Sequence, residues 1–174
     1  MSVNRRAAAL AVAALIALGS PVLTACGSAV QGAVEKAAGD AIGGNVDINS
    51  NGLSVTDSNG NQVQIGEDVT MPSNWPAEVP QFAGGKLASV MVAGDGSSVN
   101  AMWTTDAAVA DAAKAYGDAL TGGGYTQDQT ANAGGAETSQ YSGNGYQVNV
   151  VVSGTDGSTT VLVNAEKSST PSSS

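Results

Sequence analysis

Histidine is absent from the 174-residue chain, and cysteine occurs only once. These two facts exclude a disulfide bond within one chain, a histidine-based catalytic triad, and a zinc site built from histidines or several cysteines. Cations are also scarce, since six lysines and arginines stand against 15 acidic residues and give a net charge of −9. Because a nucleic-acid site needs many cations to neutralise phosphates, we expect no nucleic-acid partner.

The amino-terminal apolar run is too short to cross a membrane as a helix. It covers residues 7–18, follows Arg5 and Arg6, and is broken by Gly-Ser-Pro at 19–21. A helix over this run spans about 18 Å, well short of the roughly 30 Å hydrocarbon core of a bilayer. Residues 1–25 are therefore predicted to be an export signal peptide, and the arginine pair leaves the general secretory and twin-arginine routes both open.

The sequence Leu-Thr-Ala-Cys at residues 23–26 follows this run. It resembles the lipobox of bacterial lipoproteins, in which a leucine and two small residues precede a cysteine. The resemblance implies that the Cys26 thiol receives a diacylglyceryl group, that a peptidase cuts just before it, and that the new amino group is often acylated. Two acyl chains hold a protein stably on a membrane, so it implies a lipid-anchored protein of the cell membrane that faces the extracellular side. The alternative is an ordinary secretory signal followed by a free cysteine.

The predicted mature chain is strongly acidic. Residues 26–174 keep four lysines against all 15 acidic residues, a net charge of −11. The acidic residues are spread along the chain, a pattern that favours solubility outside the cell over a dedicated cation site.

One short segment resembles the start of a calcium-binding loop. Asp47, Asn49, Asn51 and Gly52 fit the pattern D-x-N-x-N-G. The twelfth position of such a loop supplies a bidentate glutamate, but Ser58 stands there. Because the same residues also make hairpin turns, we predict no metal site and leave calcium near this segment as the open alternative.

The chain divides into segments of different pattern. A thin apolar stripe, interrupted by Gly32 and Gly39, predicts a marginal helix or tether after Cys26. Alternating apolar residues separated by Asn-Gly pairs predict short strands, and three prolines then predict a stiff connector that Trp75 pins to the main domain. The predicted segments are a lipoprotein signal peptide at 1–25, a lipidated tether at 26–45, a small β-meander at 46–70, a proline-rich connector at 71–84, a compact domain at 85–167 and a disordered tail at 168–174.

The compact domain has one strong helical pattern among strand patterns. Residues 106–120 carry an apolar face at helical spacing, with Thr104 or Thr105 as the predicted N-cap and Asp106 in the first turn. Alternating patterns predict strands at residues 86–93, 98–104, 124–130, 137–142, 146–152 and 159–165. We therefore predict an α+β fold, an antiparallel sheet with one main helix packed on a face, preceded by the small β-meander and the lipidated tether.

The sequence contains no G-x-S-x-G, S-x-x-K, H-E-x-x-H or phosphate-loop motif. Residues 75–80 and 104–106 are similar to patterns in small actinobacterial lipoproteins, a resemblance that implies a cell-envelope setting and no activity. We predict a non-catalytic binding or structural module without catalytic residues, metal or cofactor, whose partner is an unknown envelope protein or component. The alternatives are a carrier of a small apolar ligand, for which few bulky side chains are available, and a carboxylate-based hydrolase, whose paired acids only the fold can bring together.

Overall fold

A computed structural model describes residues 28–155 and 157–168 of the chain. The predicted signal peptide, Cys26 and residues 169–174 of the predicted tail lie outside the described residues. The described part contains two helices, α1 (Ser28–Ile42) and α2 (Val109–Gly122). Its strands are β1 (Asn45–Asn49), β2 (Gly52–Thr56), β3 (Gln62–Gly66), β4 (Lys86–Val92), β5 (Ser98–Thr105), β6 (Thr126–Ala133), β7 (Ala136–Gly143), β8 (Tyr146–Thr155) and β9 (Ser158–Lys167).

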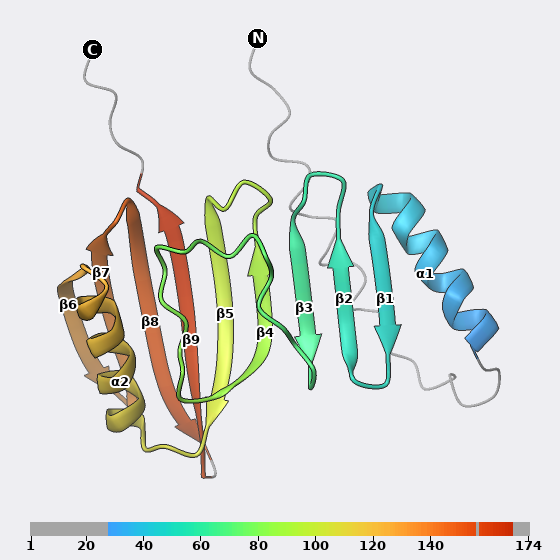
Figure 1. The fold of residues 1–174 in the computed structure, drawn as a ribbon. Helices are drawn as coiled ribbons and strands as arrows, with labels where there is room; N and C mark the ends of the chain where they lie inside the picture. Colours follow the sequence, from blue (N-terminus) through green and yellow to red (C-terminus); the bar gives the residue numbers. More distant parts are fainter. Residues whose placement is uncertain (1–27, 156, 169–174) are drawn as a thin grey trace, which may run out of the picture. The chain divides into compact units, whose positions relative to one another are not determined.

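All of these strands belong to one antiparallel sheet in the order β1-β2-β3-β4-β5-β9-β8-β7-β6 (Figure 1). Helix α2 leads the chain from β5 to β6 at the far edge, and β9, the last strand in sequence, returns to lie between β5 and β8. The hairpin between β7 and β8 turns at Asn144 and Gly145, whose φ angles of 47° and 80° are those that an Asn-Gly turn favours. The described part is thus an open antiparallel sheet with two helices, broadly an α+β fold, in agreement with the predicted class.

The segment predicted as a small meander extends this sheet. Its strands β1, β2 and β3 pair in sequence order, and β3 then pairs with β4 from Gln62 opposite Val92 to Ile65 opposite Ser89. Because a short meander is only marginally stable alone, this pairing gives it a neighbour with a packed core.

The core lies on one face of the sheet. Helix α2 supplies Ala112, Ala113, Tyr116 and Leu120 to it. The strands β4, β5, β7, β8 and β9 supply buried side chains that alternate with more exposed ones, as expected for a sheet with one covered face. These strand residues are Val90, Val92, Val99, Ala101, Trp103, Ser139, Tyr141, Tyr146, Val148, Val150, Val152, Thr159, Val161, Val163 and Ala165.

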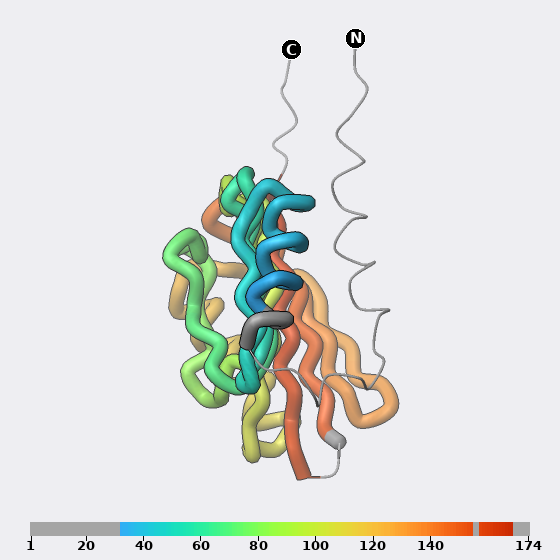
Figure 2. Tube along the Cα trace, turned by 90° about the vertical axis from the view of Figure 1, so that its right-hand side faces the viewer, coloured from blue at the N-terminus to red at the C-terminus, as the bar shows by residue number. Residues whose placement is uncertain are grey.

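The connector, residues 71–84, covers the same face of the sheet as α2 (Figures 1 and 2). Trp75 is 9% exposed and meets Trp103 of β5 edge-to-face, with ring centroids 6.2 Å apart. Its indole N–H donates a 2.8 Å hydrogen bond to the Val79 carbonyl, which holds the connector in a tight turn. The predicted pinning of the connector by Trp75 is confirmed.

Helix α2 begins later than predicted. Its first residue is Val109, and its N-cap, Ala108, provides no side-chain hydrogen bond. Thr105 is still part of β5, where it pairs with Thr159, and its hydroxyl donates to the Gly84 carbonyl at 2.7 Å. The predicted start at residue 106 and the threonine cap are therefore wrong, because sheet pairing takes Thr105 into the strand.

Helix α1 lies in the predicted tether, and a Gly-Gly pair at residues 43–44 follows its last residue. From this helix the Glu35 carboxylate accepts a 2.9 Å hydrogen bond from the backbone N–H of Ile48 in β1. Within residues 28–168, apart from residue 156, no helix is long and apolar enough to span a membrane.

Candidate binding surface

The apolar side of the sheet changes between β3 and β4. In β4, Val90 and Val92 face the core, but their direct partners in β3 are Gln64 and Gln62. Residues directly opposite each other on paired strands share a face. The apolar residues of β1, β2 and β3 therefore lie on the other face of the sheet, the one opposite α2 and the connector, which we call the open face.

These residues form an apolar patch on the open face. The strand register places them in two rows that run across β1 to β4. One row is Val46, Val55, Val63 and Met91, and the other is Ile48, Leu53, Ile65 and Ser89. Ile48, Ile65 and Met91 are 36%, 46% and 50% exposed, which are high values for large apolar side chains. Neither row contains a charged residue.

Farther along the same face, amide side chains continue one of the two rows. Asn100 of β5 pairs with Asn164 of β9, which pairs with Asn149 of β8, which pairs with Gln140 of β7. We call these four residues the amide row. They continue the register of the Met91 row, because Met91 is the partner of Asn100. The Met91 row of the open face thus changes from apolar residues to amides at β5, whereas the neighbouring Ser89 row continues with the apolar residues Met102, Leu162 and Val151.

The amide row borders a hollow of about 210 Å³. The hollow is lined by Gln140, Asn149 and Asn164 of the row, together with Gln147, Glu166 and Asp128. Asp128 lies at a β-bulge in β6 and accepts a 3.0 Å hydrogen bond from the Ser142 hydroxyl. Within the described part of the chain, the amide groups of the row have no hydrogen-bond partner, so they can donate to and accept from a ligand.

The hollow is lined by two carboxylates, those of Asp128 and Glu166, and by no lysine, so it disfavours an anionic ligand. The described strands carry two lysines, and neither lines the hollow. The register places Lys86 on the open face, opposite Thr104 at the end of β4. Lys167 lies on the other side, where its ammonium approaches the Tyr146 ring and the Asp95 carbonyl. Hydrogen bonds from Ser97 hold the pKa of Asp95 below its usual range, so that group stays ionised as well.

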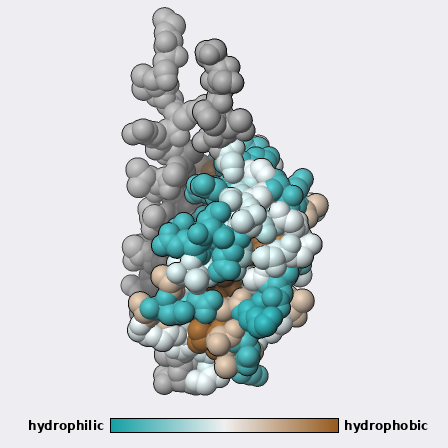
Figure 3. All heavy atoms as spheres, turned by 90° about the vertical axis from the view of Figure 1, so that its left-hand side faces the viewer, coloured by the Kyte–Doolittle hydropathy of each residue, from teal (hydrophilic) through white to brown (hydrophobic). Residues whose placement is uncertain are grey.

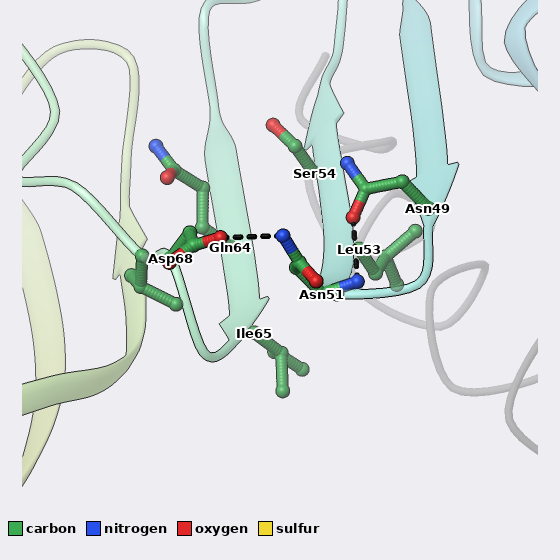
Figure 4. A pocket seen from close by; sticks show the side chains of 9 residues that line it. Asn49, Asn51, Leu53, Ser54, Gln64, Ile65 and Asp68 are labelled. Atoms are coloured by element: carbon green, nitrogen blue, oxygen red, sulfur yellow. Dashed lines mark hydrogen bonds between the residues drawn. The ribbon is translucent and has the colours of Figure 1, made fainter.

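The segment resembling a calcium loop forms the β1–β2 hairpin. Asn49 and Gly52 pair, and the Asn49 side-chain oxygen accepts a 2.9 Å hydrogen bond from the Asn51 backbone N–H, as the hairpin alternative expects (Figure 4). The Asn51 amide bonds to the Asp68 carboxylate, and the Asp47 carboxylate bonds to the Asn49 amide. A hollow of about 100 Å³ lies beside these groups. Among the described residues, no three acidic or cysteine side chains gather where they could hold a metal ion.

The described carboxylates all keep access to solvent. The buried polar residues of the described part are Ser139 and Thr159, so no aspartate or glutamate in it is buried. A general acid for glycoside hydrolysis usually needs a buried carboxyl with a raised pKa. The pKa of Asp57 moves the other way: burial opposes the shift, but hydrogen bonds from Asn61 and Asn59 outweigh it and lower the pKa.

The layer between the sheet, α2 and the connector is filled by aromatic side chains. Phe82 meets Trp103 and Tyr116 edge-to-face, with ring centroids 6.3 and 6.1 Å away. Tyr116 and Leu120 are fully buried between helix and sheet, and burial raises the pKa of the Tyr116 hydroxyl far above its ordinary value. Aromatic side chains of the connector, the sheet and the helix therefore pack against one another in this layer.

Both edges of the sheet are poor sites for adding another strand. At the β1 edge, the Glu35 carboxylate accepts a hydrogen bond from the Ile48 backbone N–H. At the other, β6 is polar, exposed along its length and bulged between Gln127 and Gln129, and the surface on that side is largely hydrophilic (Figure 3). Charge and bulges are common protections of edge strands against pairing. The open face is therefore a better candidate for binding than the edges.

The site expected from the sequence, Cys26, lies outside the described residues, so the structure places nothing around it. The apolar patch and the amide row were missed by sequence reasoning. Their residues carry ordinary strand alternation, and only the register across several strands brings them together. No family model matches the chain, and no curated protein and no solved structure matches it either.

Proposed function

We propose that this chain is a lipid-anchored, non-catalytic module on the extracellular side of the cell membrane. In this proposal Cys26 carries the anchor, as the lipobox resemblance implies, and the amide row binds an envelope protein or another envelope component. The observation that supports binding most strongly is the run of amide groups without hydrogen-bond partners across β5, β9, β8 and β7.

The chemistry of the amide row restricts the ligand. A side-chain amide both donates and accepts hydrogen bonds, so four in a row suit a ligand with many uncharged polar groups. Because Asp128 and Glu166 border the hollow, they repel phosphates and carboxylates and favour a neutral or cationic ligand. The amides project from central strands of the sheet, and a site on rigid elements is better preorganised than one on loops.

In the same proposal α2 is the main helix of the compact domain. It buries four residues on the core face, beside the connector. This arrangement closes one face of the sheet and leaves the open face to the partner.

The anchor is tested by native mass spectrometry of the full-length protein, extracted gently from its own membranes, beside a Cys26→Ser variant. We expect the mass of residues 26–174 plus acyl chains, and we expect that mass to be missing from the variant. A bare mature chain released into the medium would contradict the anchor and leave a secreted domain.

The binding site is tested by photo-crosslinking in intact cells. A photoreactive residue replaces Gln140 in the amide row, and the same residue replaces the exposed Ala115 on α2 as the matched control. We expect a discrete adduct from position 140 only, and we expect Asn149→Ala with Asn164→Ala to weaken it several-fold. Equal adducts from both positions would show that the amide row is not the binding site.

A further inference from the structure

We infer that the apolar patch of the open face rests on the bilayer to which the chain is anchored. This inference rests on the proposed lipid anchor at Cys26. It explains an arrangement that the binding function leaves unexplained: β1, β2 and β3 turn their apolar residues away from the core, and although Val46 is buried, Ile48 and Ile65 are exposed.

The position of the patch in the chain favours the bilayer as its occupant. One residue separates Cys26 from α1, and two glycines separate α1 from β1, the edge strand of the patch. Helix α1 has 15 residues and is therefore about 22 Å long. With the few extended residues at its ends, the tether holds β1 within roughly 35 Å of the anchored cysteine. The patch thus includes the strands of the sheet that are nearest to Cys26 along the chain.

The chemistry of the patch also fits a bilayer surface. The mature chain has a net charge of −11, yet its acidic residues avoid both rows of the patch. Asp47, which lies between Val46 and Ile48, faces the opposite side of the sheet because side chains alternate along a strand. Lys86, on the open face beyond the patch, is an exposed cation that can meet lipid phosphates at the rim.

The size of the patch argues against a second protein as its occupant. Two rows across four strands cover roughly 230 Å² at ordinary strand spacings. A stable protein interface covers about 800 Å² on each partner. A bilayer contact needs less area, because the anchor already keeps the domain at the membrane and makes the second contact intramolecular.

Docking by the patch is compatible with binding by the amide row. Neighbouring strands of a sheet turn by roughly 20° relative to each other. Asn100 is the direct neighbour of Met91, but several strands separate β2 from β8 and β7, so the Asn149 and Gln140 end of the amide row points in a different direction from the patch. The bilayer contact therefore orients this end of the amide row away from the lipid and toward other envelope components.

The test uses the lipidated full chain in vesicles of phosphatidylcholine and phosphatidylglycerol. Cys26 is the single cysteine, and its lipid blocks the thiol, so Ile65→Cys or Met91→Cys introduces one reactive site. A polarity-sensitive fluorophore on that site reports its surroundings, and Ala115→Cys on α2 is the matched control. We expect nitroxide-labelled lipids to quench the labels at 65 and 91 several-fold more than the label at 115. Equal quenching at all three positions would overturn the inference.

Two further measurements separate the possible failures. If the parent chain itself reacts with the fluorophore at Cys26, the lipid anchor is absent. That result would contradict the proposed function, whatever the labels at 65 and 91 report about the patch. The non-lipidated Cys26→Ser chain is labelled at position 91 and diluted in solution without lipid. We expect its fluorescence to be independent of protein concentration. A blue shift that grows with concentration would show that the patch pairs with a second copy, and would overturn the bilayer contact.

Discussion

The Tyr116 hydroxyl in α2 donates a 2.8 Å hydrogen bond to the Pro80 carbonyl in the connector. The ring of Tyr116 is wholly buried against Phe82 and Trp103. One side chain therefore joins the helix, the connector and the sheet, and it makes the two covering elements a single layer.

Removing this hydroxyl tests how much the layer depends on the bond. We expect Tyr116→Phe to lower the free energy of unfolding by about 1–2 kcal/mol, because the Pro80 carbonyl loses its partner. We expect Tyr116→Ala to lower it by about 3–5 kcal/mol, because a large cavity forms in addition. Urea unfolding of the Cys26→Ser chain measures both, with Ala115→Ser as the control. Equal effects of the two Tyr116 substitutions would show that the ring carries no stability beyond the bond.

The change of apolar side between β3 and β4 is tested by substituting two adjacent apolar residues of β4. Val90 is 2% exposed on the core face and Met91 is 50% exposed on the open face. We expect Val90→Ser to lower the free energy of unfolding by about 2–4 kcal/mol and Met91→Ser to change it by less than about 0.5 kcal/mol. A large loss from Met91→Ser in the non-lipidated chain would mean that the patch is covered within the folded protein.

The turn between β2 and β3 predicts a loss of stability in acid. The Asp57 carboxylate accepts hydrogen bonds of 2.8 and 2.9 Å from the backbone of Asn59 and Asn61, and one of 2.7 Å from the Asn61 amide. These bonds lower its pKa in the folded state despite the opposing effect of burial. The stability they contribute is therefore complete above the unfolded-state pKa of about 3.9, and it is lost as the pH falls through the lower pKa of the folded protein.

The substitution Asp57→Asn tests this assignment. We expect the variant to be less stable at neutral pH and to lose less stability than the parent between neutral pH and strong acid. Denaturant unfolding across that range measures the difference. Parallel pH profiles for the two proteins would assign the acid sensitivity to other groups.

The buried tyrosines predict the opposite behaviour in alkali. Burial raises the pKa values of Tyr116, Tyr125 and Tyr141. Since folding favours their neutral form, the stability they contribute is complete below the unfolded-state pKa of about 10 and is lost as the pH rises above it. We expect tyrosinate absorbance to rise together with the loss of near-ultraviolet circular dichroism. Ionisation of Tyr116, Tyr125 and Tyr141 near pH 10 with the dichroism intact would contradict these raised pKa values.

Local patterns in the sequence predicted the strands of the sheet, the helix α2 and the packing of Trp75 onto the main domain, and they gave a marginal helix or a tether where α1 lies. Alternation and turn residues are local signals, so these features are accessible from short windows. The start of α2 could not be predicted from a short window, because Thr105 is both a good N-cap and a good strand residue. Its pairing with Thr159 places it in the strand.

The candidate binding surface could not be predicted from the sequence for a related reason. Asn100, Asn149 and Asn164 are scattered over 65 positions of sequence, and each sits in an ordinary alternating strand. Only the insertion of β9 between β5 and β8 aligns them. The alternation of β1 to β3 likewise predicted strands with one apolar side but could not say which way that side would face.

The central place of β9 also decides when this protein can fold. This strand is the last of the described strands in sequence, and it lies between β5 and β8, where it holds the two halves of the sheet together. Contacts between residues so far apart form late and slowly. A nascent chain therefore lacks this central strand until every other described strand has been made, and truncation before β9 removes the junction rather than an edge. The order of the strands along the chain therefore postpones closure of the core until β9 has been made.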